Sequence, residues 1–299
     1  MNILRKLFKS YLFNIILVLS LTTISMVLTL KDSFSEVVLQ LQNANLYWFI
    51  IGIAFALLHR VLYGLIVTIQ ARKFNKDYKF IYGVGNSFID AFVSGITPAG
   101  TGGNISQIMT LRGHGIDLSD SVSLLWMDSI IYQLCLVIYY LIMILMRFTR
   151  FASESYLFTF VLIGFAINAA VLLSIFVVSR IPRVHKWMST KGIQIGYKLR
   201  IIKDVDKAKQ SMEEQIDRFQ QGVSDLQGNR KLILELIGLN FIRLIIYNLI
   251  PVFSAFALGI PVSMGMVIDI MALSSFVAMV SMLFPVPGAS GGAEPTYIF

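Results

Sequence analysis

Charged residues are scarce in this chain. Only 14% of the 299 residues are charged, whereas a soluble globular domain has about 25%. Hydrophobic residues make up 56% of the chain. They come in runs of about 20 residues, which is long enough for α-helices to cross a ~30 Å hydrocarbon layer. The ten-residue alternation of a membrane β-barrel is absent, so the composition predicts an all-α, polytopic membrane protein.

Residues that bind metals or form disulfides are also scarce. The single cysteine, Cys135, lies in an apolar run, which excludes a disulfide or a thiolate metal site within the chain. His59, His114 and His185 are scattered without metal-ligand spacing, and no Walker loop or zinc motif is present. We therefore expect no metal, no cofactor and no catalytic triad. The net charge of +8 fits basic cytoplasmic loops better than a nucleic-acid surface.

The apolar runs predict one integral membrane domain over residues 1–299, with about seven to eight transmembrane helices. The runs cover residues 11–30, 46–69, 80–96, 118–146, 157–179, 232–258 and 264–284, and a short helix at 105–112 would be capped by Asn104. The first run could be a signal peptide, but it is too long and no small-residue cleavage site follows it. Pro251 predicts a kink in the sixth long run.

Residues 180–231 differ from the rest, because they carry 12 Lys or Arg and 6 Asp or Glu. Apolar residues recur there at spacings of three and four, from Val205 to Leu226, which predicts an amphipathic helix. Two interpretations stay open. The helix could pack on the protein's own cytoplasmic face, or its basic residues could bind anionic lipid headgroups.

Two Gly/Pro segments interrupt the apolar pattern, at residues 94–104 and 285–295. Residues 98–103 and 287–292 share the order Pro, small, small, hydroxyl, Gly, Gly, and both follow an apolar run. The glycines could simply allow close helix packing. The shared pattern instead favours two irregular segments at membrane depth, which persist only where they are buried in protein or line a wet cavity.

The distribution of Lys and Arg predicts how the first Gly/Pro segment is built. If residues 80–112 crossed the membrane once, 9 basic loop residues would lie inside and 14 outside. If they form a re-entrant hairpin, 20 lie inside and 3 outside. The positive-inside rule favours the hairpin, with a cytoplasmic N-terminus. The two segments then have inverted orientations, as the paired broken helices at transporter substrate sites do.

Four charged residues fall near the middle of predicted membrane helices: Arg60, Asp90, Asp128 and Arg243. Each lies roughly 15–21 Å from the start of its predicted helix, at a depth where a charge costs at least ~2.5–3.5 kcal/mol. Two positive and two negative residues at similar depth predict pairing, either as structural ion pairs or as a polar pathway for a charged headgroup or a coupling proton. Asp269 and Glu294 are shallower candidates, and helix N-termini after the Gly-Gly pairs would suit a phosphate.

Residues 94–107, Arg60 and the signature at 285–295 resemble the lysylphosphatidylglycerol synthase transmembrane-region family, which includes the flippase half of the bacterial multiple peptide resistance factor. The resemblance covers nearly the whole chain. It implies a multi-pass flippase or transporter of lipids in the bacterial cytoplasmic membrane. The chain matches the family's signature at Pro98, Gly102, Gly103, Gln107, Pro287, Gly291, Gly292 and Glu294. The candidate substrate-binding residues also include Arg60, Asp90, Asn104, Asp128, Arg243 and Asp269.

The chain departs from the family pattern in two ways. No soluble aminoacyl-transferase domain follows, so lipid lysylation should be absent. The helices usually found after the last motif are also missing, so we expect the native protein to continue beyond Phe299.

Three functions remain open from the sequence. The first is a flippase for a phospholipid or polyprenyl-linked phosphate. The second is a membrane enzyme acting on a lipid phosphate, with a buried carboxylate as base, although mid-depth charges favour transport. The third is a non-transporting partner of a synthase or cell-envelope complex. The expected partners are these lipids and, at residues 180–231, anionic headgroups; a homodimer is also compatible, and no nucleic acid is expected.

Overall fold

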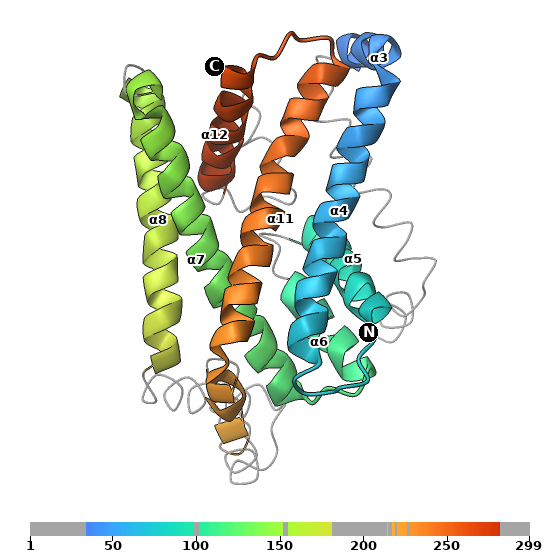
Figure 1. The fold of residues 1–299 in the computed structure, drawn as a ribbon, viewed down its shortest axis with the longest axis vertical. Helices are drawn as coiled ribbons and strands as arrows, with labels where there is room; N and C mark the ends of the chain where they lie inside the picture. Colours follow the sequence, from blue (N-terminus) through green and yellow to red (C-terminus); the bar gives the residue numbers. More distant parts are fainter. Residues whose placement is uncertain are drawn as a thin grey trace, which may run out of the picture.

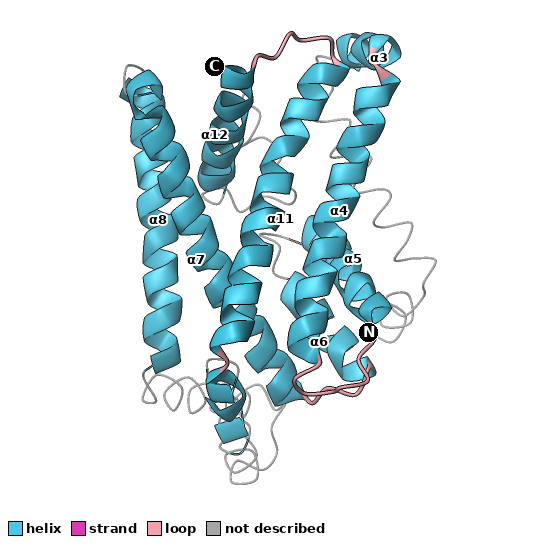
Figure 2. Ribbon diagram, in the orientation of Figure 1, coloured by secondary structure: helices cyan, strands magenta, loops and turns pink. Residues whose placement is uncertain are grey.

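The computed structural model describes residues 34–97, 102–151, 155–180, 214, 217–218, 220–225 and 228–281. The predicted first helix at 11–30, most of the basic region and the second Gly/Pro segment lie outside these residues, as do Pro98, Pro287, Gly291, Gly292 and Glu294. Within the described part the chain is helical, with turns between the helices and no strand. The prediction of an all-α membrane protein is confirmed, and Figure 2 shows the helices and their short connections.

The helices follow the predicted order. They are α3 (Phe34–Asn43), α4 (Leu46–Ala71), α5 (Phe80–Ile96), α6 (Gly102–Gly113), α7 (Leu118–Phe151), α8 (Ser155–Arg180), α11 (Arg230–Ala257) and α12 (Met264–Ser281). Among the described residues, α4, α7 and α11 are long and apolar enough to cross a membrane, and α5, α8 and α12 contain shorter apolar stretches. Pro251 lies inside α11.

Two short elements differ from the prediction. Residues 31–45 lie between the predicted helices at 11–30 and 46–69, where no helix was predicted, but α3 forms within them. The helix after the first Gly/Pro segment begins at Gly102 rather than at residue 105, so Asn104 lies inside α6 and does not cap it. Thr97 does so instead, because its side-chain Oγ1 accepts a hydrogen bond of 3.0 Å from the Gly102 N–H.

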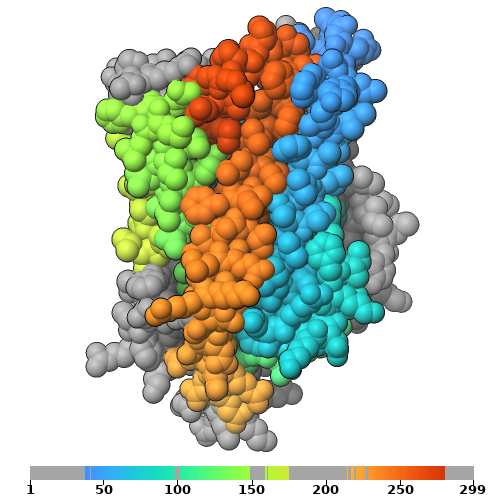
Figure 3. Space-filling model, viewed as in Figure 1, coloured from blue at the N-terminus to red at the C-terminus, as the bar shows by residue number. Residues whose placement is uncertain are grey.

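Helices α4 and α11 run side by side along the molecule (Figure 1), and together they form one continuous face (Figure 3). Their contact begins where the Asn45 N–H donates 2.7 Å to the carbonyl of Ala257. One turn further, the Trp48 ring stacks on Phe253 and Phe256. The outward side of α4 exposes large apolar residues, as expected of a surface that contacts lipid: Leu46, Tyr47, Phe49, Ile50, Ile53, Leu57 and Leu58.

Helices α4 and α5 approach each other most closely at Gly64. A Cβ atom added there would lie 2.5 Å from the Cα of Val84, so only glycine fits. The same holds for Gly83, whose missing Cβ leaves room for Thr68 and for the carbonyl of Gly64. Small residues at such crossings let membrane helices pack by close contact of their backbones. The crossing brings the start of α5 against the last third of α4.

Helices α5 and α6 form a hairpin that starts and ends at the same end of the molecule (Figure 1). The ring of Tyr82, near the start of α5, stacks on His114, just after α6, with 4.0 Å between centroids. The Asn75 amide, in the loop before α5, donates 3.0 Å to the carbonyl of His114. Gly115 follows with a positive φ of 82°, and the Ile116 N–H bonds back to Leu111, which terminates α6. The chain then enters α7 from the end at which α5 began.

Part of the basic region is described, and it includes residues 217–218 and 220–225. Val223, one of the predicted apolar positions, is buried there. Gly222 lies against Ser123 of α7, and Arg218 forms an exposed ion pair with Asp117 at 3.9 Å. These described residues therefore pack on the end of the helical bundle, in line with the first of the two interpretations.

Candidate functional site

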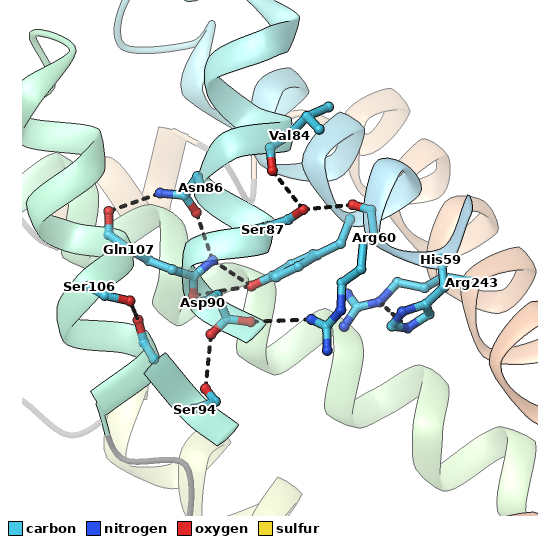
Figure 4. Close-up of polar contacts among 12 residues, drawn as sticks. His59, Arg60, Val84, Asn86, Ser87, Asp90, Ser94, Ser106, Gln107 and Arg243 are labelled. Atoms are coloured by element: carbon cyan, nitrogen blue, oxygen red, sulfur yellow. Dashed lines mark hydrogen bonds and ion pairs between the residues drawn. The ribbon is translucent and has the colours of Figure 1, made fainter. Parts of the chain in front are cut away.

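A polar cluster lies between α4, α5, α6, α7 and α11, and Figure 4 shows part of it, around Arg60, Asp90 and Arg243. Its most accessible part is an ion pair between Arg60 of α4 and Asp90 of α5, with 3.6 Å between Nη1 and Oδ2. The Arg60 side chain is 32% exposed and the Asp90 side chain 18%. The close crossing at Gly64 positions this pair, and the Ser87 hydroxyl reinforces it by donating 2.8 Å to the carbonyl of Arg60.

The first turn of α6 lies directly against Asp90. Gly103 has no side chain, and a Cβ atom there would collide with the Asp90 carboxylate and the Ser94 hydroxyl. Ser94 itself donates to Asp90 Oδ1 at 3.3 Å. Gly103 therefore lets the start of α6 close over the acid, and the described residues Ser94 and Gly103 of the first Gly/Pro segment lie beside the charged pair.

A second group of contacts joins α6 to α4 and α5 through Gln107. Its amide donates 2.9 Å to the Tyr63 hydroxyl and 2.9 Å to Asn86 Oδ1. The Asn86 amide in turn donates 3.0 Å to the backbone carbonyl of Gln107. Asn86 and Gln107 are almost completely buried. Buried amides stabilise a packed interior only when their hydrogen bonds are made, so this group fixes where α6 lies.

Arg243 of α11 is held by rings and neutral groups. Its guanidinium carbon lies 4.0 Å from the Tyr63 ring centroid and 4.6 Å from that of Tyr132. Its Nε donates 3.3 Å to His59 Nε2, and its Nη1 donates 3.4 Å to Asn240 Oδ1. Because ring faces attract cations, the two tyrosines stabilise a charge that is only 8% exposed.

Asp128 of α7 is the deepest carboxylate of the cluster. It is 5% exposed, and Oδ1 accepts a 3.1 Å hydrogen bond from the Gln70 amide of α4. Within the described part of the chain, no basic side chain lies within ion-pair distance of it. Arg243 and Asp128 interact electrostatically but do not form the close pair that equal numbers of opposite charges suggested.

The remaining described candidates, Asp269, Asn104 and Gly102, do not bind to the charged residues of the cluster. Asp269 pairs with Arg147 at 2.8 Å, and Arg147 lies 19 residues beyond Asp128, or about 28 Å along α7. Asp269 therefore does not join the cluster. Asn104 is exposed on α6, one residue beyond buried Gly103, and Gly102 binds back to Thr97.

Several residues of the cluster were not anticipated from the sequence. They are His59, Tyr63, Gln70, Asn86, Tyr132 and Asn240. A signal for the amides was present, because a Gln or Asn inside an apolar helix must find a partner in the bundle. The two tyrosines carried no such signal, since aromatic residues are common throughout the chain.

The chain matches the family described as the lysylphosphatidylglycerol synthase TM region over residues 14–299. It belongs to this family. The match covers nearly the whole chain and confirms the resemblance seen in the Gly/Pro signature. No curated protein and no solved structure matches it. Membership of the lysylphosphatidylglycerol synthase TM-region family relates the chain to membrane proteins that handle lipids.

The cluster has the chemistry of a site for a charged, partly hydrated group. It combines two guanidinium groups, two carboxylates, a set of buried amides and two phenol rings, contributed by five helices. Among the described residues no group of three or more His, Cys, Asp or Glu could hold a metal ion. These side chains could bind a charged group by electrostatic attraction and hydrogen bonding.

Proposed function

We propose that this member of the family is a lipid flippase of the bacterial cytoplasmic membrane, which moves a phospholipid or a lipid-linked phosphate between leaflets without chemical change. The observation that carries the proposal is the partly exposed Arg60–Asp90 pair beside the interrupted α5–α6 hairpin. Charged side chains inside a membrane bundle are costly, and they mark pathways for polar substrates.

The two guanidinium groups supply the binding chemistry for an anionic headgroup. Figure 4 shows Arg60 and Arg243 approaching the same region, from α4 and α11. Arg60 is the more accessible of the two, so a phosphate entering the cluster would meet it first. Arginine suits this role because its planar guanidinium can donate two hydrogen bonds to one phosphate. Asp90 would then interact with a cationic or hydroxyl group on the headgroup.

The hairpin supplies the membrane arrangement that the proposal needs. We propose that α5 and α6 form a re-entrant element whose two outer ends face the cytoplasm. The stacking of Tyr82 on His114 supports this arrangement, because it holds those two ends together. The positive-inside rule supports it independently. The inverted partner of this element would be the second Gly/Pro segment.

The transport proposal can be tested by replacing Arg60 in reconstituted vesicles of phosphatidylethanolamine and phosphatidylglycerol. Translocation of a trace of headgroup-labelled fluorescent phosphatidylglycerol would be followed by chemical quenching of the outer leaflet. Arg60→Gln should slow translocation about 10- to 100-fold, because a hydrogen bond to a charged group contributes about 1.5–3 kcal/mol. Arg147→Gln is the matched control, because it breaks an ion pair outside the cluster.

Two results would contradict the proposal. One is equal translocation by wild type and Arg60→Gln. The other is turnover of the lipid into a new chemical species, detected by mass spectrometry of the vesicle lipids, which would make the protein an enzyme.

A further inference from the structure

The polar cluster contains a carboxylate that headgroup binding alone does not explain. Asp90 is paired with Arg60 at 3.6 Å, and Asp269 is paired with Arg147 at 2.8 Å. Asp128 is more deeply buried than either, and it accepts from the uncharged Gln70 amide. A buried carboxylate without a close cation binds a proton more readily than a paired one, because its surroundings stabilise the ionised form less.

The groups that face Asp128 come from several elements. Those that interact with it electrostatically are Tyr63 on α4, Asp90 on α5 and Arg243 on α11, together with Tyr132 and Cys135 on its own helix. The only basic group among them is Arg243. Its environment of two rings, His59 and Asn240 keeps it in place whether or not Asp128 is ionised.

His59 is a poorer proton acceptor than Asp128. Its Nε2 accepts the hydrogen bond from Arg243 Nε, so the imidazole is neutral there, with its proton on Nδ1. A second proton would place a cation directly against the guanidinium. A metal cation also fits Asp128 poorly, since Gln70 presents its N–H and not its oxygen to the carboxylate.

The charges of the cluster link proton binding to anion binding. With both acids ionised, Arg60 and Arg243 are balanced by Asp90 and Asp128. When Asp128 is protonated, the cluster carries a net charge of +1, and Asp90 alone balances the two guanidinium groups. An anionic phosphate then binds more tightly, and by linkage the bound phosphate favours the protonated acid to the same extent.

We propose that Asp128 takes up and releases the proton that couples movement of an anionic lipid to the transmembrane proton gradient. This inference rests on the proposed flippase function. The proton enters from one side of the membrane, bonds to a carboxylate oxygen of Asp128, accompanies the bound phosphate and leaves to the other side. Proton and anionic headgroup therefore move in the same direction.

Proton binding can be measured without transport, by infrared difference spectroscopy of the full chain in nanodiscs during a pH titration. A protonated carboxylic acid has its own carbonyl stretch. We expect a band that is lost in Asp128→Asn and kept in Asp269→Asn, the matched control, because Asp269 lies on α12 and pairs with Arg147 at the far end of α7. The band should persist to higher pH in phosphatidylglycerol than in phosphatidylcholine. Persistence of the whole band in Asp128→Asn, or identical titrations in the two lipids, would overturn the inference.

The same variant separates this inference from the flippase proposal in vesicles. An imposed pH gradient should change the translocation rate of labelled phosphatidylglycerol by up to about tenfold per pH unit for one proton. Asp128→Asn should abolish that response. Asp90→Asn should slow translocation but keep the response to the gradient, because the proton site remains.

The outcomes distinguish the two proposals. If wild-type translocation does not respond to the pH gradient, proton coupling alone is refuted. If no translocation occurs while the infrared band is intact, the flippase proposal is refuted. If Asp128→Asn does not fold, Asp128→Glu should retain the band at a shifted frequency, and its absence would count against the site.

Discussion

At the scale of single residues, the most informative feature is how Arg243 is stabilised. Two basic and two acidic residues at similar depth suggested two ion pairs, yet only Arg60 and Asp90 form one. Arg243 instead lies between the rings of Tyr63 and Tyr132. Rings stabilise a cation without neutralising it, so the charge remains available to a ligand.

This role of the rings can be tested at Tyr132. Tyr132→Leu removes the ring and should lower the stability of the protein by about 0.5–2 kcal/mol, the range of a cation–π contact. Tyr132→Phe keeps the ring and serves as the control, and it should stay close to wild type. Unfolding in detergent micelles, followed by fluorescence, would measure both. Equal destabilisation by the two variants would show that the hydroxyl, and not the ring face, is what matters.

The charged residues could be predicted from the sequence, but their partners could not. Arg60, Asp90, Asp128 and Arg243 stand out because charge is rare in apolar helices. Which of them meet depends on the rotation of each helix about its axis, and single-sequence periodicity does not fix that rotation. Asp269 shows the same point, because it was a shallower candidate for the cluster and instead pairs with Arg147.

At the scale of elements, the crossing of α4 and α5 decides where the site lies. Long apolar runs predicted both helices closely, and the bounds of α5 were predicted as residues 80–96. Their crossing point was not predicted, since it depends on Gly64 and Gly83 facing each other across the interface. The start of α6 was also misplaced, because the capping oxygen belongs to Thr97 and not to Asn104.

The crossing makes a sharp prediction for Gly64. Gly64→Ala puts a methyl group against the backbone of Val84 and should destabilise the protein by about 1–3 kcal/mol, as overpacking does. Gly238→Ala in α11 is the control, because nothing lies within 4 Å of a Cβ atom there. It should be neutral or slightly stabilising, since alanine favours helix. Thermal unfolding in detergent would compare them, and an unchanged melting temperature for Gly64→Ala would contradict the close crossing.

At the scale of the whole molecule, the ends of the helices define two poles. The loop before α5 and the turn after α6 share one pole, where the Asn75 amide meets His114. The α11–α12 connection lies at the other, close to the start of α4. If the bundle spans the membrane along its long axis, these poles face opposite compartments.

Cysteine labelling can test that arrangement in whole cells. In a Cys135→Ala background, the exposed positions Lys76 and Arg112 would each be replaced by Cys, with Gly259 at the opposite pole as the reference. Lys76→Cys and Arg112→Cys should resist a membrane-impermeant maleimide until the membrane is permeabilised, whereas Gly259→Cys should react at once. Labelling of Lys76→Cys and Arg112→Cys from opposite sides would rule out the re-entrant arrangement.

The contact between Gly103 and Asp90 has a consequence for how the amino-acid sequence varies among natural variants of this protein. The distance between the two oppositely charged groups depends on the absence of one methyl group on a neighbouring helix. A larger residue at position 103 would displace the acid before it altered the fold. Among natural variants, a change at position 103 should therefore be accompanied by a change at position 90, so that the two sites diversify together.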